Sequence, residues 1–225
     1  MQLTRLDEPP EYAKQREELR QAEVDLMRQG ERVATLRREL PPGTPVQDYA
    51  FGEGPRNLAD GDEPVSSVRL SELFTAPDRA LVVQHVMYGK LQASPCPMCT
   101  MWVDGLNAAV RHVQQNADYV VAAAADPPEL RAHARARGWD AVRLLSCGDN
   151  SFQYDFGAED ESGMQNSSIS VFTLDPDGSP RHFYTCHPQM ADDIGERGID
   201  LLSPVWHLLD LTPQGRGEWY ASLDY

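Results

Sequence analysis

The sequence has no long apolar run, few cysteines and a deficit of positive charge. Its longest apolar stretch, around residues 81–87, is far shorter than the roughly 20 residues that a helix needs to cross a bilayer, so we expect no membrane partner. The 225 residues carry 20 Lys and Arg against 35 Asp and Glu, a formal net charge of −15. Because binding to phosphates needs clustered basic side chains, this balance argues against nucleic acid as a partner.

Four cysteines are too few for a fold built on disulfides. The N-terminus is polar and charged and lacks the apolar segment of an export signal, so we expect a cytoplasmic location. In that reducing compartment a close pair of cysteines is more often redox-active or metal-binding than structural. The close pair in this chain is the CxxC motif Cys96-Pro97-Met98-Cys99.

Residues 8–40 predict one long helix. Apolar side chains recur at every seventh residue, while Glu, Arg and Gln occupy the other faces, and the helix must end at Pro41-Pro42-Gly43. The apolar row consists of Tyr12, Leu19, Leu26, Val33 and Leu40. We therefore expect an N-terminal helical arm over residues 1–42, packed along its own domain or along a second copy in a homodimer.

The rest of the chain predicts an α/β fold. Residues 43–78 are rich in Pro, Gly and Asp and indicate a connector with short strands at 46–51 and 65–70. A core over residues 79–190 and a C-terminal extension over 191–225, packed on that core, follow. In the core we expect strands at 80–88, 119–125 and 141–147, helices at 97–116 and 127–137, and a β-hairpin of 168–174 with 181–186. A strand that leads directly into a CxxC at a helix start, inside a βαβ unit, is typical of the thioredoxin fold.

The CxxC motif is well placed for thiol chemistry. A thiolate attacks disulfides, and a helix N-terminus lowers a thiol pKa because its unpaired N–H groups favour the anion. Pro97 suits the first helical turn, where its missing N–H costs nothing. Cys99 follows one turn after Cys96 on the same face, so the two can close a disulfide. We expect Cys96 to attack and Cys99 to resolve the mixed disulfide, without a cofactor.

Two other classes of function stay open. In the first, Cys96 and Cys99 bind copper or zinc together with one more ligand. The candidates for that ligand are His85, Cys147, Cys186 and His187. In the second, the protein is a non-catalytic interaction module that dimerises through its N-terminal helix. Adjacent residues of a strand point to opposite faces, so the neighbours Cys186 and His187 are not expected to act together.

Several segments together resemble a domain-of-unknown-function family of thioredoxin-like proteins, often described as predicted dithiol-disulfide oxidoreductases. The resemblance covers about residues 10–218 and implies a thioredoxin-like or peroxiredoxin-like α/β fold with the CxxC at the redox position. It also implies that Arg197 or Arg216 closes over the site. Trp102 and Asp104 lie on the CxxC helix and are further candidates to support the site, Asp104 as a proton acceptor one turn after Cys99. The segments that carry the resemblance are 37–41, 68–74, 85–87, 96–99 with Trp102 and Asp104-Gly105, Gly138-Trp139, Ser146-Cys147-Gly148 with Phe152 and Asp155-Phe156, 170–172, 182–184, and 209–213 with Gly215-Arg216.

The sequence also departs from this pattern. Thioredoxins place a cis-proline beside the CxxC, whereas the matching stretch here is Asn166-Ser167-Ser168-Ile169. The residues before Cys96 lack the peroxiredoxin pattern, so we do not expect efficient peroxide reduction. The acid surplus lies in loops at 60–63, 155–161 and 192–200, which biases the site against anionic partners. The expected partner is therefore a thiol or disulfide, on a protein or a small molecule.

Overall fold

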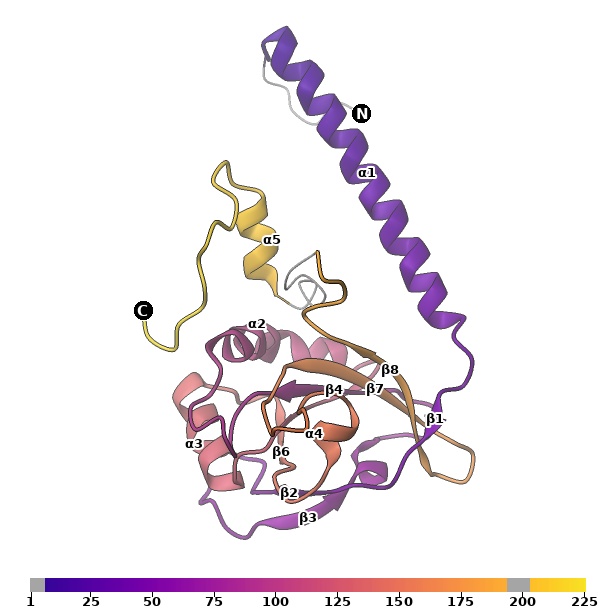
Figure 1. Cartoon of the computed structure of the whole chain (residues 1–225), viewed down its shortest axis with the longest axis vertical. Coiled ribbons are helices and arrows are strands. Elements are labelled where there is room, and N and C mark those ends of the chain that lie inside the picture. The colour runs from indigo at the N-terminus through magenta and orange to yellow at the C-terminus, as the bar shows by residue number, and fades with distance from the viewer. Residues whose placement is uncertain (1–6, 194–202) are drawn as a thin grey trace. The chain divides into compact units, whose positions relative to one another are not determined.

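The computed structural model describes residues 7–193 and 203–225 (Figure 1). The chain divides into two compact units, Met1–Pro42 and Gly43–Tyr225. Within the described residues, the first unit contains a single helix, and the second contains an eight-stranded sheet with helices. No described helix is long and apolar enough to cross a membrane.

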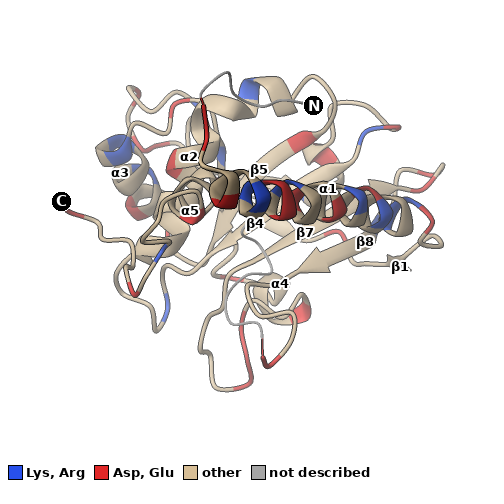
Figure 2. Cartoon of the chain, turned by 90° about the horizontal axis from the view of Figure 1, so that it is seen from above, with Lys and Arg blue, Asp and Glu red and all other residues tan. Residues whose placement is uncertain are grey.

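The N-terminal unit is the helix α1 (Pro10–Arg38), which confirms the helix predicted over residues 8–40. Pro10 stands in its first turn and Arg37 and Arg38 in its last, where the helix dipole favours basic side chains. Acidic and basic residues alternate along it (Figure 2), and several pair within one turn, as Arg20 does with Glu17. None of its residues is buried, and four of the five residues of its apolar row are exposed, with Val33 half-buried.

The second unit is built on one sheet with the strand order β1-β8-β7-β4-β5-β6-β2-β3. The neighbours β4, β5 and β6 are parallel, and β7 joins the other side of β4 in the antiparallel sense. The bounds are β1 (Thr44–Pro45), β2 (Ala50–Glu53), β3 (Ser66–Arg69), β4 (Leu81–Val86), β5 (Asp118–Ala123), β6 (Arg143–Ser146), β7 (Ser168–Leu174) and β8 (Pro180–Cys186).

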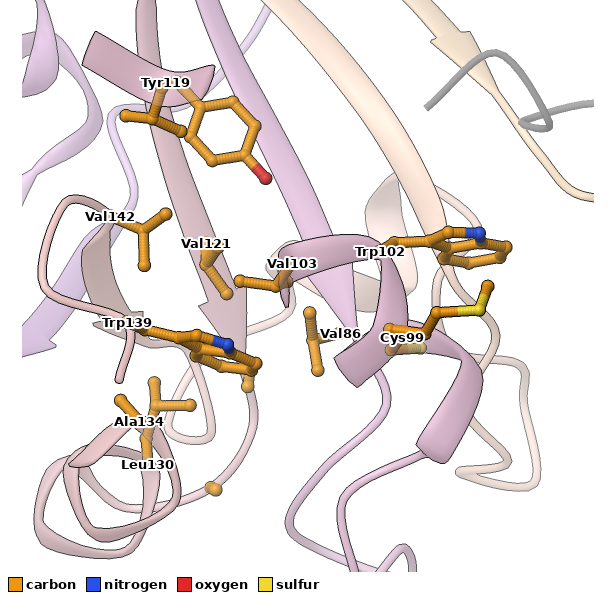
Figure 3. Packing of buried hydrophobic residues seen from close by; sticks show 14 of the residues in the cluster. Val86, Cys99, Trp102, Val103, Tyr119, Val121, Leu130, Ala134, Trp139 and Val142 are labelled. Atoms are coloured by element: carbon orange, nitrogen blue, oxygen red, sulfur yellow. The ribbon is translucent and has the colours of Figure 1, made fainter. Parts of the chain in front are cut away.

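The central strand β4 separates two hydrophobic cores, because alternate side chains of a strand point to opposite faces. Val82 and Val86 pack into the first core, with α2 (Pro97–Val113), α3 (Pro127–Arg137) and α5 (Pro204–Asp210). Figure 3 shows this cluster, in which Val86 lies beside α2. Leu81 and Val83 pack into the second core, with β2, the short helix η1 (Leu70–Leu73) and α4 (Phe152–Asp155).

These elements confirm the predicted thioredoxin-like α/β fold. The strand β4 leads into the CxxC, α2 crosses to the parallel strand β5, and the hairpin β7–β8 closes the other side. The hairpin turns at Gly178, whose positive φ of 84° suits the predicted turn. Likewise Gly138 ends α3 with a φ of 71° in the left-handed region.

The segment before the core contributes strands to the sheet. β2 pairs antiparallel with both β3 and β6, so β2 is an internal strand of the sheet. The side chain of Asp48 fixes η1 by accepting hydrogen bonds from the Ser71 amide and hydroxyl, both at 2.8 Å. The short helix α4, which the sequence analysis did not predict, covers the second core with Phe152.

The buried guanidinium of Arg131, on α3, organises the loop that follows β2. Only 3% of its side chain is exposed. It donates to the carbonyls of Asn57 at 3.2 Å, of Asp60 at 3.1 Å and of Gly61 at 3.1 Å, and to that of Pro55. Its Nε pairs with Asp62 at 2.9 Å. One side chain thus binds four backbone carbonyls and one carboxylate of the loop.

We predict that Arg131→Ala lowers the free energy of unfolding by about 2–4 kcal/mol, because buried acceptors lose their donor. Urea denaturation followed by circular dichroism measures this. The matched control is Arg111→Ala, whose side chain is 74% exposed and lies 3.8 Å from Asp140. The control should change stability by no more than about 0.5 kcal/mol. Equal effects of the two substitutions would contradict the role given to Arg131.

Candidate functional site

Cys96 is the N-cap residue of α2, as the sequence predicted. Its amide donates to the carbonyl of Met87, just after β4, at 3.0 Å. One turn later, the Cys99 amide donates to the Cys96 Sγ at 3.4 Å. The sulfur of Cys96 therefore takes the place of a capping oxygen at the positive end of a 17-residue helix.

The two thiols are unequal. Cys99 is fully buried in the first core beside Trp102 (Figure 3), whereas Cys96 is partly exposed. The hydrogen bond to Cys96 raises the pKa of the Cys99 thiol well above its usual value, and burial raises it further. Hydrogen bonds with the Met87 backbone and the Ser167 hydroxyl act in the opposite direction. Cys99 thus keeps its proton and donates it toward the sulfur of Cys96.

Ser167 completes the surroundings of the buried thiol. It lies just before β7, in the stretch that lacks the cis-proline of thioredoxins, and 5% of it is exposed. Its hydroxyl bonds to Cys99, so a polar group stands beside the pair. The stretch stands out in the sequence by its missing proline, but no pattern in the sequence predicts that the Ser167 hydroxyl lies beside Cys99.

Cys96 opens into a cavity of about 420 Å³. Pro97 and Trp102, both expected to support the site, line it. The remaining wall comes from α2, from the end of β4, from the loops before β7 and after β8, and from the C-terminal segment. These residues are Met87, Met98, Asn166, Ser167, Pro188, Gln189, Tyr220 and Ala221. No sequence motif predicted that residues beyond β8 line the cavity, because only the fold brings them close to the thiol.

The charged residues proposed to support the site have other contacts. Asp104 accepts hydrogen bonds from the Trp139 indole at 2.8 Å and from the guanidinium of Arg137, and it does not line the cavity. Arg216 pairs with Asp210 at 2.9 Å and lies over the ring of Trp206, 5.0 Å from its centre. Arg197 lies outside the described residues.

The candidate metal ligands are divided between the two faces of the sheet. Cys186 packs against the first core, whereas Cys147 is buried in the second, where its thiol donates to the Ala123 carbonyl at 3.2 Å. Burial raises the pKa of Cys147 to about 12. Among the residues that the structure describes, no three His, Cys, Asp or Glu side chains form a group that could hold a metal ion. This geometry gives no support to the copper or zinc hypothesis.

His85 lies on the second face and starts a chain of hydrogen bonds that the sequence analysis did not foresee. Its ring stacks on Phe152, with centroids 5.0 Å apart. Its Nε2 lies 2.9 Å from the Ser170 hydroxyl, which lies 2.9 Å from that of Thr185. The Thr185 hydroxyl in turn lies 2.7 Å from the Nε2 of His182.

Burial, the largest cause, lowers the pKa of His182, and a backbone hydrogen bond at Tyr184 acts in the opposite direction. Each hydroxyl can donate one hydrogen bond and accept another, so Ser170 and Thr185 link the Nε2 atoms of His85 and His182. The Nδ1 of His85 is buried and has no hydrogen-bond partner. Burial, the largest cause, lowers the pKa of His85 to about 3.

The low pKa of His85 predicts a pH dependence of stability. The folded pKa of His85, about 3, lies below its unfolded value of 6.5, so the unfolded state binds one more proton between these values. The free energy of unfolding should fall as the pH falls through this window, by up to about 1.4 kcal/mol per pH unit from this residue. His85→Gln should have a shallower slope between pH 6 and pH 4 (roughly the middle of that window). His112 is exposed, so His112→Gln serves as the control. Equal slopes in both variants would contradict the low pKa of His85.

Several solved structures of low sequence identity are similar to most of this chain. A cysteine-to-serine variant of PrxQ from Xylella fastidiosa has a TM-score of 0.49 and 13% identity, and the match covers 73% of this chain and 94% of that one. AhpC from Enterococcus faecalis has a TM-score of 0.49 and 15% identity, covering 72% and 87%. Peroxidoxin BcpB from Mycobacterium tuberculosis has a TM-score of 0.48 and 15% identity, covering 73% and 94%.

No curated protein matches the sequence of this chain. A protein family does match it, and the match runs over residues 1–225. The family is described as "Bacterial protein of unknown function (DUF899)". The segments that suggested a domain-of-unknown-function family are thus accounted for along the whole chain, and the protein belongs to the DUF899 family.

Proposed function

We propose that the protein is a dithiol-disulfide oxidoreductase that acts through Cys96 and Cys99. The observation that carries the proposal is the position of Cys96 Sγ, which caps α2 and accepts the Cys99 amide at 3.4 Å. An N–H group aimed at a sulfur stabilises its thiolate, which is the reactive form. The buried Cys99 keeps its proton until it is needed, which suits a resolving thiol.

The exchange proceeds in two steps. The Cys96 thiolate attacks one sulfur of a disulfide RSSR, which forms a mixed disulfide and releases the thiolate of RSH. Cys99 then gives up its proton, attacks the Cys96 sulfur and releases the second thiol. The substrate gains two electrons and two protons, while the protein gains the Cys96–Cys99 disulfide. The reverse sequence oxidises a dithiol.

We predict that the pair forms an intramolecular disulfide in buffers of reduced and oxidised dithiothreitol. Loss of two thiols at one midpoint, counted by alkylation and mass spectrometry, measures this. A pair that stays reduced at every ratio would refute the proposed function. Cys147→Ser is the matched control and should leave the midpoint unchanged, because that thiol lies in the other core.

The order of attack gives a second prediction. Cys99→Ser should accumulate a mixed disulfide on Cys96 with the added substrate, because no resolving thiol remains. Cys96→Ser should lower the exchange rate by roughly 100-fold or more, because the buried Cys99 is protonated and has too small a thiolate fraction to replace Cys96. Stable adducts on Cys99 rather than Cys96 would reverse the roles.

A second candidate activity is self-association through α1. Its apolar row is exposed, with Tyr12 at 57%, Leu19 at 58% and Leu26 at 72%. A heptad row on a 29-residue helix is suited to pairing with a second copy. We predict a dimer for the full chain by light scattering and a monomer for Leu26→Lys. Gln21→Lys, on another face, is the control; a monomeric full chain would exclude this activity.

A further inference from the structure

The cavity beside Cys96 gives access to one sulfur of the pair, whereas Cys99 is fully buried. Its volume of about 420 Å³ falls within the roughly 300–1,000 Å³ of small-ligand pockets. A reacting sulfur that enters this cavity reaches Cys96. Its shape therefore selects the substrate as much as the thiol does.

The wall of the cavity is apolar and aromatic. Met87 and Met98 contribute thioethers, which adapt to ligands of irregular shape, and Trp102 and Tyr220 contribute rings. Thioethers and rings together favour an aromatic guest, since sulfur contacts with ring edges stabilise such pairs. Pro188 adds a further rigid apolar surface.

The polar groups of the wall are neutral. Asn166, Ser167 and Gln189 offer amide and hydroxyl groups, which orient a ligand without requiring a charge on it. Among the described lining residues none is acidic or basic. The formal net charge of −15 of the whole chain adds a long-range repulsion against anions.

The C-terminal segment holds one side of the cavity in place. Arg137, which also pairs with Asp104 of the CxxC helix, donates to the Leu223 carbonyl at 3.0 Å. Trp219 packs edge-on against Trp206 of α5, with centroids 5.5 Å apart. These contacts anchor the segment on both sides of Tyr220, which lines the cavity and is 63% exposed.

We propose that the substrate of the Cys96–Cys99 pair is a small, uncharged organic disulfide with an aromatic substituent. The inference rests on the proposed function. The substituent occupies the cavity between Met98, Trp102 and Tyr220, and its sulfur meets Cys96 Sγ. The dithiol passes two electrons and two protons to the disulfide, which leaves as two thiols, and an added dithiol such as dithiothreitol reduces the protein again.

The test compares four disulfides at one pH with the prereduced full-length protein. Dipyridyl disulfide is aromatic and neutral, bis(hydroxyethyl) disulfide is neutral without a ring, dithiobis(nitrobenzoate) is aromatic and anionic, and glutathione disulfide is anionic. Each second-order rate is divided by the rate of the same disulfide with free dithiothreitol, which removes differences in intrinsic reactivity. We expect the normalised rate of dipyridyl disulfide to exceed each of the others at least tenfold and to saturate with concentration.

Variants assign the preference to the cavity. Tyr220→Ala and Met98→Ala should each reduce the normalised rate of dipyridyl disulfide at least fivefold relative to that of bis(hydroxyethyl) disulfide. The controls are Tyr154→Ala and Met164→Ala, which remove exposed side chains of the same types that do not line the cavity. They should leave all four rates unchanged.

Failure of the inference differs from failure of the proposed function. If the pair forms its disulfide in dithiothreitol buffers but the normalised rates are equal, or an anionic disulfide is fastest, the substrate class is wrong and the redox activity stands. Faster reduction of a protein disulfide, with insulin as the probe, would also overturn the inference. If the pair forms no disulfide in those buffers, the proposed function itself fails.

Discussion

The hydrogen bond from the Cys99 amide to the Cys96 sulfur is the contact on which the site depends. It exists because α2 begins at Pro97, which in turn depends on where β4 ends. Cys96 is fixed from behind by its own amide, bonded to the Met87 carbonyl. A helix that began one residue later would turn the sulfur away from the N–H groups and remove the difference between the two thiols.

The two faces of the sheet have separate chemistry. The face with α2 carries the thiol pair and its cavity, and the opposite face carries the chain from His85 to His182. Strand alternation produces this division, since Val86 and His85 are neighbours in sequence and lie in different cores. It also separates Cys147 from the thiol pair, since Cys147 lies in the second core and Cys99 in the first.

Much of the fold was predictable because its signals are local. Apolar strands, the prolines at 97 and 127 and the glycine at 138 each mark an element boundary in the sequence, and the structure begins or ends helices there. The pairing of β2 with β6 and the packing of α4 were not predictable, because short segments of mixed polarity gain their structure from distant partners. The same reason explains the site. A motif identified the two cysteines, whereas Ser167, Gln189 and Tyr220 reach them only by tertiary contacts.

The bridge made by Arg137 has a practical consequence. Because one guanidinium joins the CxxC helix at Asp104 to the chain end at Leu223, the last few residues belong to the site although they carry no reactive group. Purification tags and fusion partners therefore belong at the N-terminus, where α1 forms a separate compact unit. A peptide appended after Tyr225 would disturb the segment that lines the cavity. Proteins trimmed at this end by proteases would keep both thiols but differ in the ligands that they bind.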